Sequence, residues 1–86
     1  MKDIMYFYLR GCPYCHKADA MVAELIAEDE RYRQIRISAI EESANMAVAD
    51  LFDYYYVPCF YVDGIKKHEG VPTKEKIRAV LDEALK

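Results

Sequence analysis

The hydrophobic period of the sequence changes abruptly at residues 10–13. Residues 4–9 form an uninterrupted aromatic and aliphatic run, which favours a central strand covered on both faces. Beyond it, apolar side chains recur three and four residues apart, as in an amphipathic helix, at Ala18, Met21, Val22, Leu25 and Ile26. Pro13 fits the first helical position, where no backbone N–H is needed. The sequence therefore predicts a strand and a helix that meet in a sharp corner at Gly11 and Cys12.

The middle of the chain predicts a second strand and a second helix. Residues 34–38 alternate between apolar and polar side chains, which indicates a short, partly exposed strand. A strand, a helix and a strand in this order predict two parallel strands with a right-handed crossover. Ser43 is a suitable cap for a second helix that runs to about Asp53. Its inward-facing side chains are expected to be Met46 or Ala47, Val48, Leu51 and Phe52.

The C-terminal part of the sequence predicts a hairpin and a third helix. Residues 59–62 and 65–69 flank Asp63-Gly64, a pair that supplies the positive φ angles of a two-residue turn. After Gly70, Pro72 and Thr73 open a segment with helical period. Its apolar face comprises Ile77, Val80, Leu81, Ala84 and Leu85. The predicted order of elements is thus β-α-β-α-β-β-α.

Two cysteines lie three residues apart where the first helix should begin. The unpaired N–H groups of a first helical turn and the positive end of the helix dipole favour a thiolate at Cys12. Cys15, one turn further along, is expected to be less exposed and less ionised. It is therefore suited to attack a mixed disulfide held on Cys12. This pattern predicts a thiol–disulfide oxidoreductase in which Cys12 is the nucleophile and Cys15 the resolving thiol.

The same cysteines are also compatible with a protein that is not an enzyme. Residues 12–16 also spell C-x-x-C-H, the attachment site of a c-type haem, and two thiols can contribute to a zinc or iron–sulfur site. A c-type haem needs export and usually a helical fold, and a second Cys/His pair at zinc-ligand spacing is absent from the sequence. The alternative is therefore a metal, iron–sulfur or haem binding module. The oxidoreductase interpretation requires no tightly bound cofactor.

Length, composition and charge limit the partners. A chain of 86 residues has room for one domain, residues 1–86, and 53% apolar residues favour a folded core. A net charge of -3 argues against binding to nucleic acid. The longest apolar runs fall well short of the roughly 20 residues of a membrane-spanning helix, and no secretory signal is visible. We therefore expect a cytoplasmic protein, a monomer, without a membrane partner.

The sequence resembles the glutaredoxins, small members of the thioredoxin-like superfamily, over nearly its whole length. The resemblance rests on CPYC at residues 12–15 and on Val57-Pro58 followed by the strand 59–62. It implies a thioredoxin-like α/β fold with a four-stranded mixed sheet. The first and third helices would cover one face and the second helix the other. It also implies that Pro58 is cis and faces the dithiol, and that the backbone of Val57 receives the substrate.

The resemblance also implies a substrate site. Its residues would be Arg10, Tyr14, Val57, Pro58 and Gly70. Glutaredoxins carry Gly-Gly and an acidic residue before the last helix, whereas Gly70 is followed here by Val71 and Pro72, and Pro72 lacks an N–H that could meet a carboxylate. Arg10, two residues before Cys12, could partly replace the positive charge that is missing from this glutathione-carboxylate site. The substrates would be protein disulfides or glutathione mixed disulfides, and the reductant either glutathione or a thioredoxin-type reductase.

The third cysteine admits two interpretations. Cys59 directly follows Pro58, so it could lie near the dithiol and act as a third redox group or a glutathionylation site. Free cysteine is also among the most buried residue types. The sequence favours the second interpretation, in which Cys59 is a buried strand residue with ordinary packing.

Overall fold

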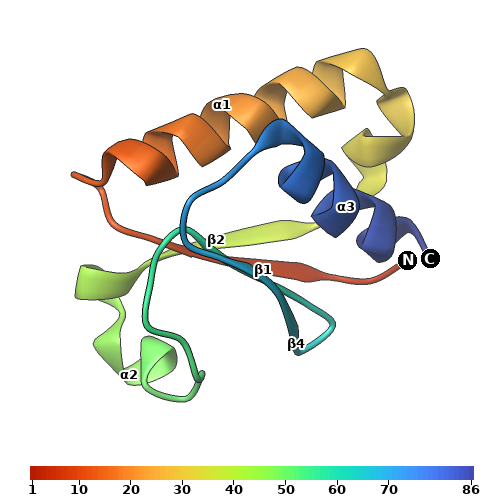
Figure 1. Ribbon diagram of the computed structural model, residues 1–86. Coiled ribbons are helices and arrows are strands. Elements are labelled where there is room, and N and C mark those ends of the chain that lie inside the picture. The colour runs from red at the N-terminus through yellow and green to blue at the C-terminus, as the bar shows by residue number, and fades with distance from the viewer.

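A four-stranded mixed sheet with strand order β2-β1-β3-β4 organises the computed structural model, which describes residues 1–86 (Figure 1). The strands are β1 (Ile4–Tyr8), β2 (Ile37–Glu41), β3 (Cys59–Val62) and β4 (Ile65–Glu69). The helices are α1 (Pro13–Glu28), α2 (Met46–Ala49) and α3 (Lys74–Leu85), with 3-10 helices η1 (Glu30–Gln34) and η2 (Glu42–Ala44). Strand β2 is parallel to β1, whereas β1 and β3, and β3 and β4, are antiparallel. The predicted fold class is confirmed.

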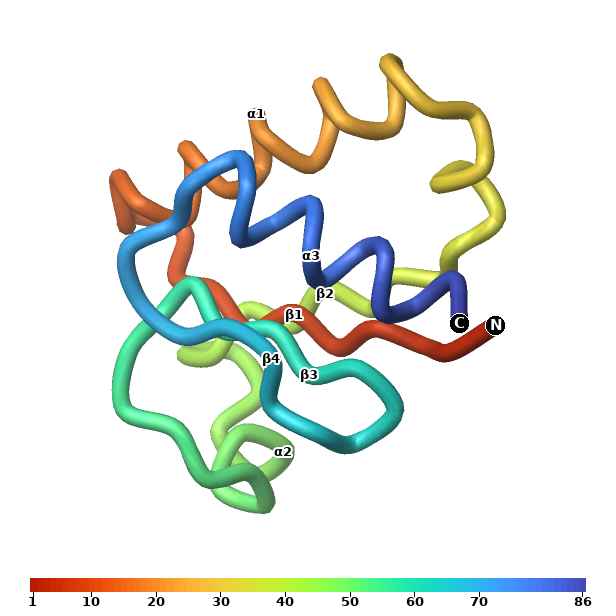
Figure 2. The backbone as a smooth tube through the Cα atoms, turned by 45° about the vertical axis from the view of Figure 1, so that its right-hand side comes forward, coloured from red at the N-terminus to blue at the C-terminus, as the bar shows by residue number.

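The two faces of the sheet carry separate cores. Helices α1 and α3 cover one face and α2 lies on the other, as predicted (Figures 1 and 2). On the α1 and α3 face, the rings of Tyr6 and Phe60 stack with their centroids 4.4 Å apart. The smaller core on the α2 face contains Phe7, Ala49, Cys59 and Tyr61. Side chains that alternate along β1 therefore fill both cores, as expected of a central strand.

Turn and cap residues fix the ends of most elements where the sequence predicts them. Helix α1 has Cys12 as its N-cap and Pro13 in its first turn. Asp63 and Gly64 have φ angles of 52° and 83° in the turn between β3 and β4. The hydroxyl of Thr73 accepts a hydrogen bond from the Lys76 N–H at 3.1 Å and caps α3.

The termini lie side by side. The Lys2 N–H donates to the Ala84 carbonyl at 2.7 Å, and the Lys2 ammonium pairs with Glu83 at 3.0 Å. Figure 1 shows both ends of the chain at the edge of the molecule away from the loop that carries Cys12. None of the helices combines the length and the apolar character needed to cross a membrane.

The prediction of a second helix from Ser43 to about Asp53 is wrong. The Glu41 carboxylate accepts the Ala44 N–H at 3.1 Å and starts a 3-10 turn that contains Ser43. Asn45 then leaves helical geometry with φ -139° and ψ 46°, so that α2 is only four residues long. Met46, Val48 and Leu51, expected to face inward, are exposed, and Ala49 and Phe52 make the contacts with the sheet.

The prediction of a second strand at residues 34–38 is shifted. The Asp29 carboxylate accepts the Arg31 N–H at 3.0 Å and caps η1, which includes Gln34. The chain therefore enters the sheet only at Ile37, which pairs with Ile4 of β1. Ile35 is buried in the main core from the segment before the strand, which explains why it resembled a strand residue.

Candidate active site

Cys12 is the N-cap of α1 and half-buried. The Cys15 N–H donates to the Cys12 sulfur at 3.3 Å, so an unpaired backbone donor of the first turn points at this atom. The carbonyl oxygen of Val57 lies 4.0 Å from the same sulfur. An N–H aimed at a sulfur stabilises the charge that it carries when it attacks or leaves a disulfide.

Cys15 is completely buried one turn further along α1. Burial is the main cause that raises the pKa of the Cys15 thiol to about 12, so this group is a neutral thiol at pH 7. The buried hydroxyl of Tyr6 donates to the carbonyl oxygen of Cys15 at 3.1 Å and connects β1 to the first turn of the helix. Burial also raises the pKa of Tyr6, and its hydroxyl therefore remains a donor. Of the two thiols, only Cys12 is open to a substrate.

The segment that faces Cys12 contains the Val57-Pro58 bond. This bond is cis, as the resemblance implied, and Pro58 is buried. The Gly70 N–H donates to the carbonyl oxygen of Pro58 at 2.9 Å. Gly70 has φ of 90°, a conformation that glycine adopts without the steric cost of a side chain. The structure thus brings Cys12, Val57, Pro58 and Gly70 into one site.

The loop before Cys12 is held through the backbone of Arg10. The Arg10 N–H donates to the Glu41 carboxylate at 3.1 Å, and a ring nitrogen of His16 lies 2.6 Å from the Arg10 carbonyl oxygen. Hydrogen bonds from Ser43 and from Arg10 lower the pKa of Glu41 to about 2. The carboxylate therefore stays charged across the physiological range. The Arg10 side chain itself is exposed and makes no ion pair.

Glu69 holds the segment before Val57. One of its carboxylate oxygens accepts the Tyr55 N–H at 2.5 Å and the Tyr56 N–H at 2.9 Å. The other oxygen pairs with the Lys66 ammonium at 2.8 Å. Lys66 and then the two N–H groups lower the pKa of Glu69 to about 2. Glu69 therefore fixes the chain before the cis bond, and its neighbour Gly70 fixes the chain after it.

Exposed apolar side chains come from three segments of the site. Tyr14 is in the first turn of α1, Tyr56 precedes Val57, and Val71 follows Gly70. Their exposed fractions are 45%, 69% and 55%. The Lys17 ammonium lies 5.4 Å from the centre of the Tyr14 ring. The segments that meet at Cys12 thus present an apolar surface to solvent.

Sequence reasoning missed Glu41 and Glu69 as parts of the site. Both are acidic residues at strand ends, and only the folded chain shows that their carboxylates accept loop N–H groups. His16 is exposed, and its ring contacts the Arg10 carbonyl. The favoured interpretation of Cys59 is confirmed, because it is fully buried in the core on the α2 face. Burial raises its pKa to about 12.

Comparisons with known proteins agree with this geometry. A family model described as a thioredoxin domain matches residues 3–82. No curated protein matches the chain in sequence.

Solved structures share the fold at low sequence identity. Oxidised thioredoxin from Plasmodium falciparum superposes with a TM-score of 0.74 at 13% identity, over 99% of this chain and 82% of that one. A structure described as a malarial protein gives a TM-score of 0.75 at 14% identity, over 100% and 99% of the two chains. Thioredoxin O2 from Arabidopsis thaliana gives 0.62 at 19% identity, over 100% and 76%. The chain belongs to the thioredoxin-domain family, a family of thiol–disulfide oxidoreductases.

Proposed function

We propose that this protein reduces protein disulfides through Cys12 and Cys15. The observation that carries the proposal is the pairing of a half-buried sulfur, which accepts the Cys15 N–H at 3.3 Å, with a fully buried thiol on the next turn. A sulfur that receives a helix N-terminal N–H is suited to nucleophilic attack. A buried neutral thiol is suited to wait until a mixed disulfide has formed.

The proposed reaction has two exchanges. The Cys12 thiolate attacks one sulfur of the substrate disulfide, forms a mixed disulfide, and releases the other substrate sulfur as a thiolate that takes up a proton. Cys15 then loses its proton and attacks the Cys12 sulfur. The second substrate thiol leaves, and the protein keeps a Cys12–Cys15 disulfide. An external dithiol or thiol reductant returns two electrons, and Cys15 regains its proton, which restores the Cys12 thiolate and the Cys15 thiol.

The substrate would lie against the segment that precedes Pro58. The Val57 carbonyl faces Cys12, and an extended peptide that pairs with this backbone would bring its own sulfur towards the nucleophile. Tyr14, with Tyr56 and Val71, would cover the apolar flanks of the peptide. Gly70 leaves room beside Tyr56, whose Cβ is 4.0 Å from the position that a Cβ on residue 70 would occupy.

A glutaredoxin-like, glutathione-dependent activity is the second candidate. It is favoured by the unpaired guanidinium of Arg10, which lies two residues before Cys12 and could meet a glutathione carboxylate. One comparison separates the candidates: turnover with glutathione and its reductase against turnover with thioredoxin reductase and NADPH. We further propose that the protein acts as a cytoplasmic monomer without a tightly bound cofactor.

Cysteine variants test the proposed function. Cys12→Ser should abolish disulfide reduction, and Cys15→Ser should accumulate a mixed disulfide with the substrate, detected by mass spectrometry. Cys59→Ser is the matched control, because Cys59 is buried in the other core, and it should retain activity. Full turnover by Cys12→Ser would refute the proposal. A visible absorption band, or one zinc per chain that blocks thiol labelling, would favour the binding module instead.

A further inference from the structure

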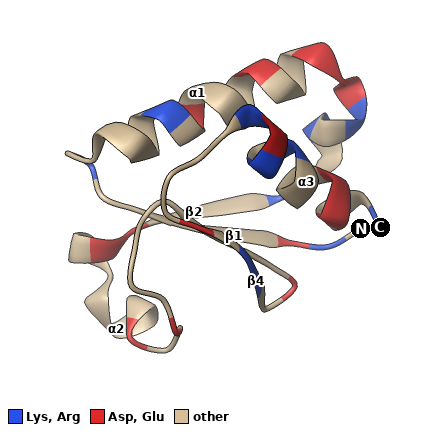
Figure 3. Ribbon diagram, viewed as in Figure 1, with Lys and Arg blue, Asp and Glu red and all other residues tan.

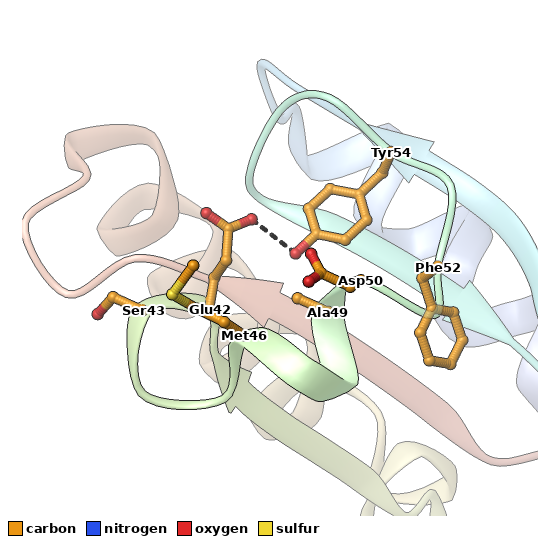
Figure 4. Close-up of a pocket in the computed structure, with 7 residues that line it drawn as sticks. All are labelled: Glu42, Ser43, Met46, Ala49, Asp50, Phe52 and Tyr54. Carbon is orange, nitrogen blue, oxygen red and sulfur yellow. Dashed lines mark hydrogen bonds between the residues drawn. The ribbon is translucent and has the colours of Figure 1, made fainter.

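A pocket of about 430 Å³ lies on the α2 face of the sheet, between η2, α2 and the segment that follows α2. Met46, Ala49, Phe52 and Tyr54 form its apolar lining, and Glu42 and Asp50 add two carboxylates. Figure 4 shows Glu42 and Tyr54 pointing toward one another across the pocket, with Asp50 at the end of α2. This volume is within the range of pockets that bind small groups.

The two carboxylates have no cation in the folded chain. The Tyr54 hydroxyl donates to Glu42 at 2.6 Å, and burial, followed by Glu42, raises the pKa of Tyr54 so that this hydroxyl stays a donor. Neither Glu42 nor Asp50 has a lysine or arginine nitrogen within 4.0 Å. Seven basic residues of the chain form ion pairs, all of them with other carboxylates. The pocket therefore combines an apolar wall with uncompensated negative charge.

This chemistry fits a basic side chain. No group of three or more His, Cys, Asp or Glu residues is placed to hold a metal ion, and the mixture of apolar side chains and two carboxylates matches an organic cation. A lysine or arginine has an aliphatic stem that can lie against Met46 and Phe52, and a charged head that can meet the carboxylates. A guanidinium or ammonium can also lie over the face of Tyr54.

Two residues that line the pocket adjoin, along the chain, segments of the proposed substrate site. Glu42 follows Glu41, whose carboxylate holds the Arg10 N–H two residues before Cys12. On the other side of the pocket, Tyr54 leads directly into Tyr55 and Tyr56, which are 85% and 69% exposed, and then into Val57. Figure 3 shows acidic residues around η2 and α2 and basic residues in the loop before α1 and on its early turns. A partner protein bound at Cys12 would therefore cover the tyrosines and meet an acidic edge at α2.

We propose that this pocket binds a lysine or arginine side chain of the protein whose disulfide is reduced at Cys12. The inference rests on the proposed function and specifies its substrate class: disulfide proteins with a basic residue beside the reactive cystine. The pocket acts on specificity and takes no part in the exchange of electrons. Its contribution falls with rising salt, because exposed charges are screened.

A peptide series tests the proposal. Disulfide-bonded peptides that carry one lysine at successive positions from the cystine are compared with the same peptides carrying glutamine, at low salt. At the best position, the lysine peptide should have roughly tenfold higher kcat/KM, through KM, which corresponds to about 1.4 kcal/mol. The Glu42→Gln/Asp50→Asn variant should bring this ratio close to one. Asp3→Asn/Glu30→Gln, which makes the same charge change at exposed sites away from Cys12, should preserve the ratio.

The outcomes separate this inference from the proposed function. Turnover of both peptides at equal kcat/KM at every position overturns the pocket proposal and leaves the oxidoreductase intact. A preference that survives in Glu42→Gln/Asp50→Asn, or that is lost equally in the control pair, overturns it as well. Binding of free spermidine at the pocket without any peptide preference would show a small-molecule site and refute a protein partner. No turnover of either peptide refutes the proposed function itself.

Discussion

The proton on Cys15 controls the proposed second exchange. This thiol is fully buried, and its pKa is raised to about 12, chiefly by burial. At neutral pH only a very small fraction of Cys15 is thiolate. As long as the pH stays below the pKa, this fraction rises about tenfold for each unit by which the pH increases. Release of the substrate from Cys12 should therefore be slower than its capture.

We expect the release step to accelerate with pH. A mixed disulfide between Cys12 and a chromogenic aromatic thiol should release that thiol about ten times faster per pH unit between pH 7 and 9. Stopped-flow absorbance measures the release, and Cys15→Ser provides the blank. A release rate that is flat above pH 7 would contradict the role given to the buried thiol.

Glu69 should act as a positioning residue for the substrate backbone. It holds the N–H groups of Tyr55 and Tyr56 directly before Val57. In Glu69→Ala, KM for a disulfide peptide should rise roughly tenfold, or about 1.4 kcal/mol, with kcat changed by less than about twofold. Glu69→Gln keeps an oxygen acceptor and should recover most of the affinity.

The matched control is Glu83→Ala. Glu83 also pairs with lysines, but it lies on α3 beside Lys2, at the chain ends. This variant should leave KM unchanged. If Glu69→Ala and Glu83→Ala lower the melting temperature and the activity in parallel, without a change in KM, then Glu69 has only a structural role.

At the scale of elements, α2 is held by very few side chains. Ala49 and Phe52 face the sheet, and the Phe52 ring lies 5.0 Å from the rings of both Phe7 and Tyr61. Leu51, by contrast, is 82% exposed. A four-residue helix with one buried alanine depends on the tertiary contacts that follow it, because isolated helices of this length are unstable in water.

Substitutions at neighbouring positions should separate the observed α2 from a longer amphipathic helix. Phe52→Ala should lower the free energy of unfolding by about 3 kcal/mol, since it removes most of an aromatic side chain from the smaller core. Leu51→Gln should change it by less than about 0.5 kcal/mol. Urea unfolding followed by circular dichroism measures both. A larger cost at Leu51 than at Phe52 would favour the longer helix with Leu51 inward.

The elements that sequence reasoning predicted are those with local determinants. The Cys12-Pro13 start of α1, the Asp63-Gly64 turn and the Thr73 cap are each fixed by residues within a few positions of one another. One carboxylate oxygen of Glu41 caps η2 by accepting the Ala44 N–H, and the other accepts the N–H of Arg10, 31 residues earlier in the chain. The period of the apolar residues shows neither contact. The shifted β2 and the short α2 are consequences of such side-chain caps.

At the scale of the whole molecule, folding buries several thiol and phenol groups in their protonated form. Burial is the first cause that raises the pKa of Cys15, Cys59 and Tyr32 to about 12. In the unfolded chain these groups ionise near their ordinary pKa values of about 8.5 for cysteine and 10 for tyrosine. Unfolding above that range therefore releases protons, and alkaline pH favours the unfolded state.

Stability should accordingly be complete below about pH 8 and decrease as the pH rises towards 12. Urea unfolding at a series of pH values measures the free energy of unfolding directly. Cys59→Ser removes one of the titrating groups and should make the decrease shallower. A free energy of unfolding that is constant from pH 8 to 11 would show that these thiols and phenols ionise equally in both states.

The hydrogen bond from Lys2 to Ala84 has a practical consequence. A fluorophore, surface anchor or fusion partner attached at either end would project from the edge remote from the dithiol, leaving access to the reactive sulfur unobstructed. A brief linker could also join the ends into a ring, which could be reopened between Asp63 and Gly64 to give a circular permutant with the same sheet.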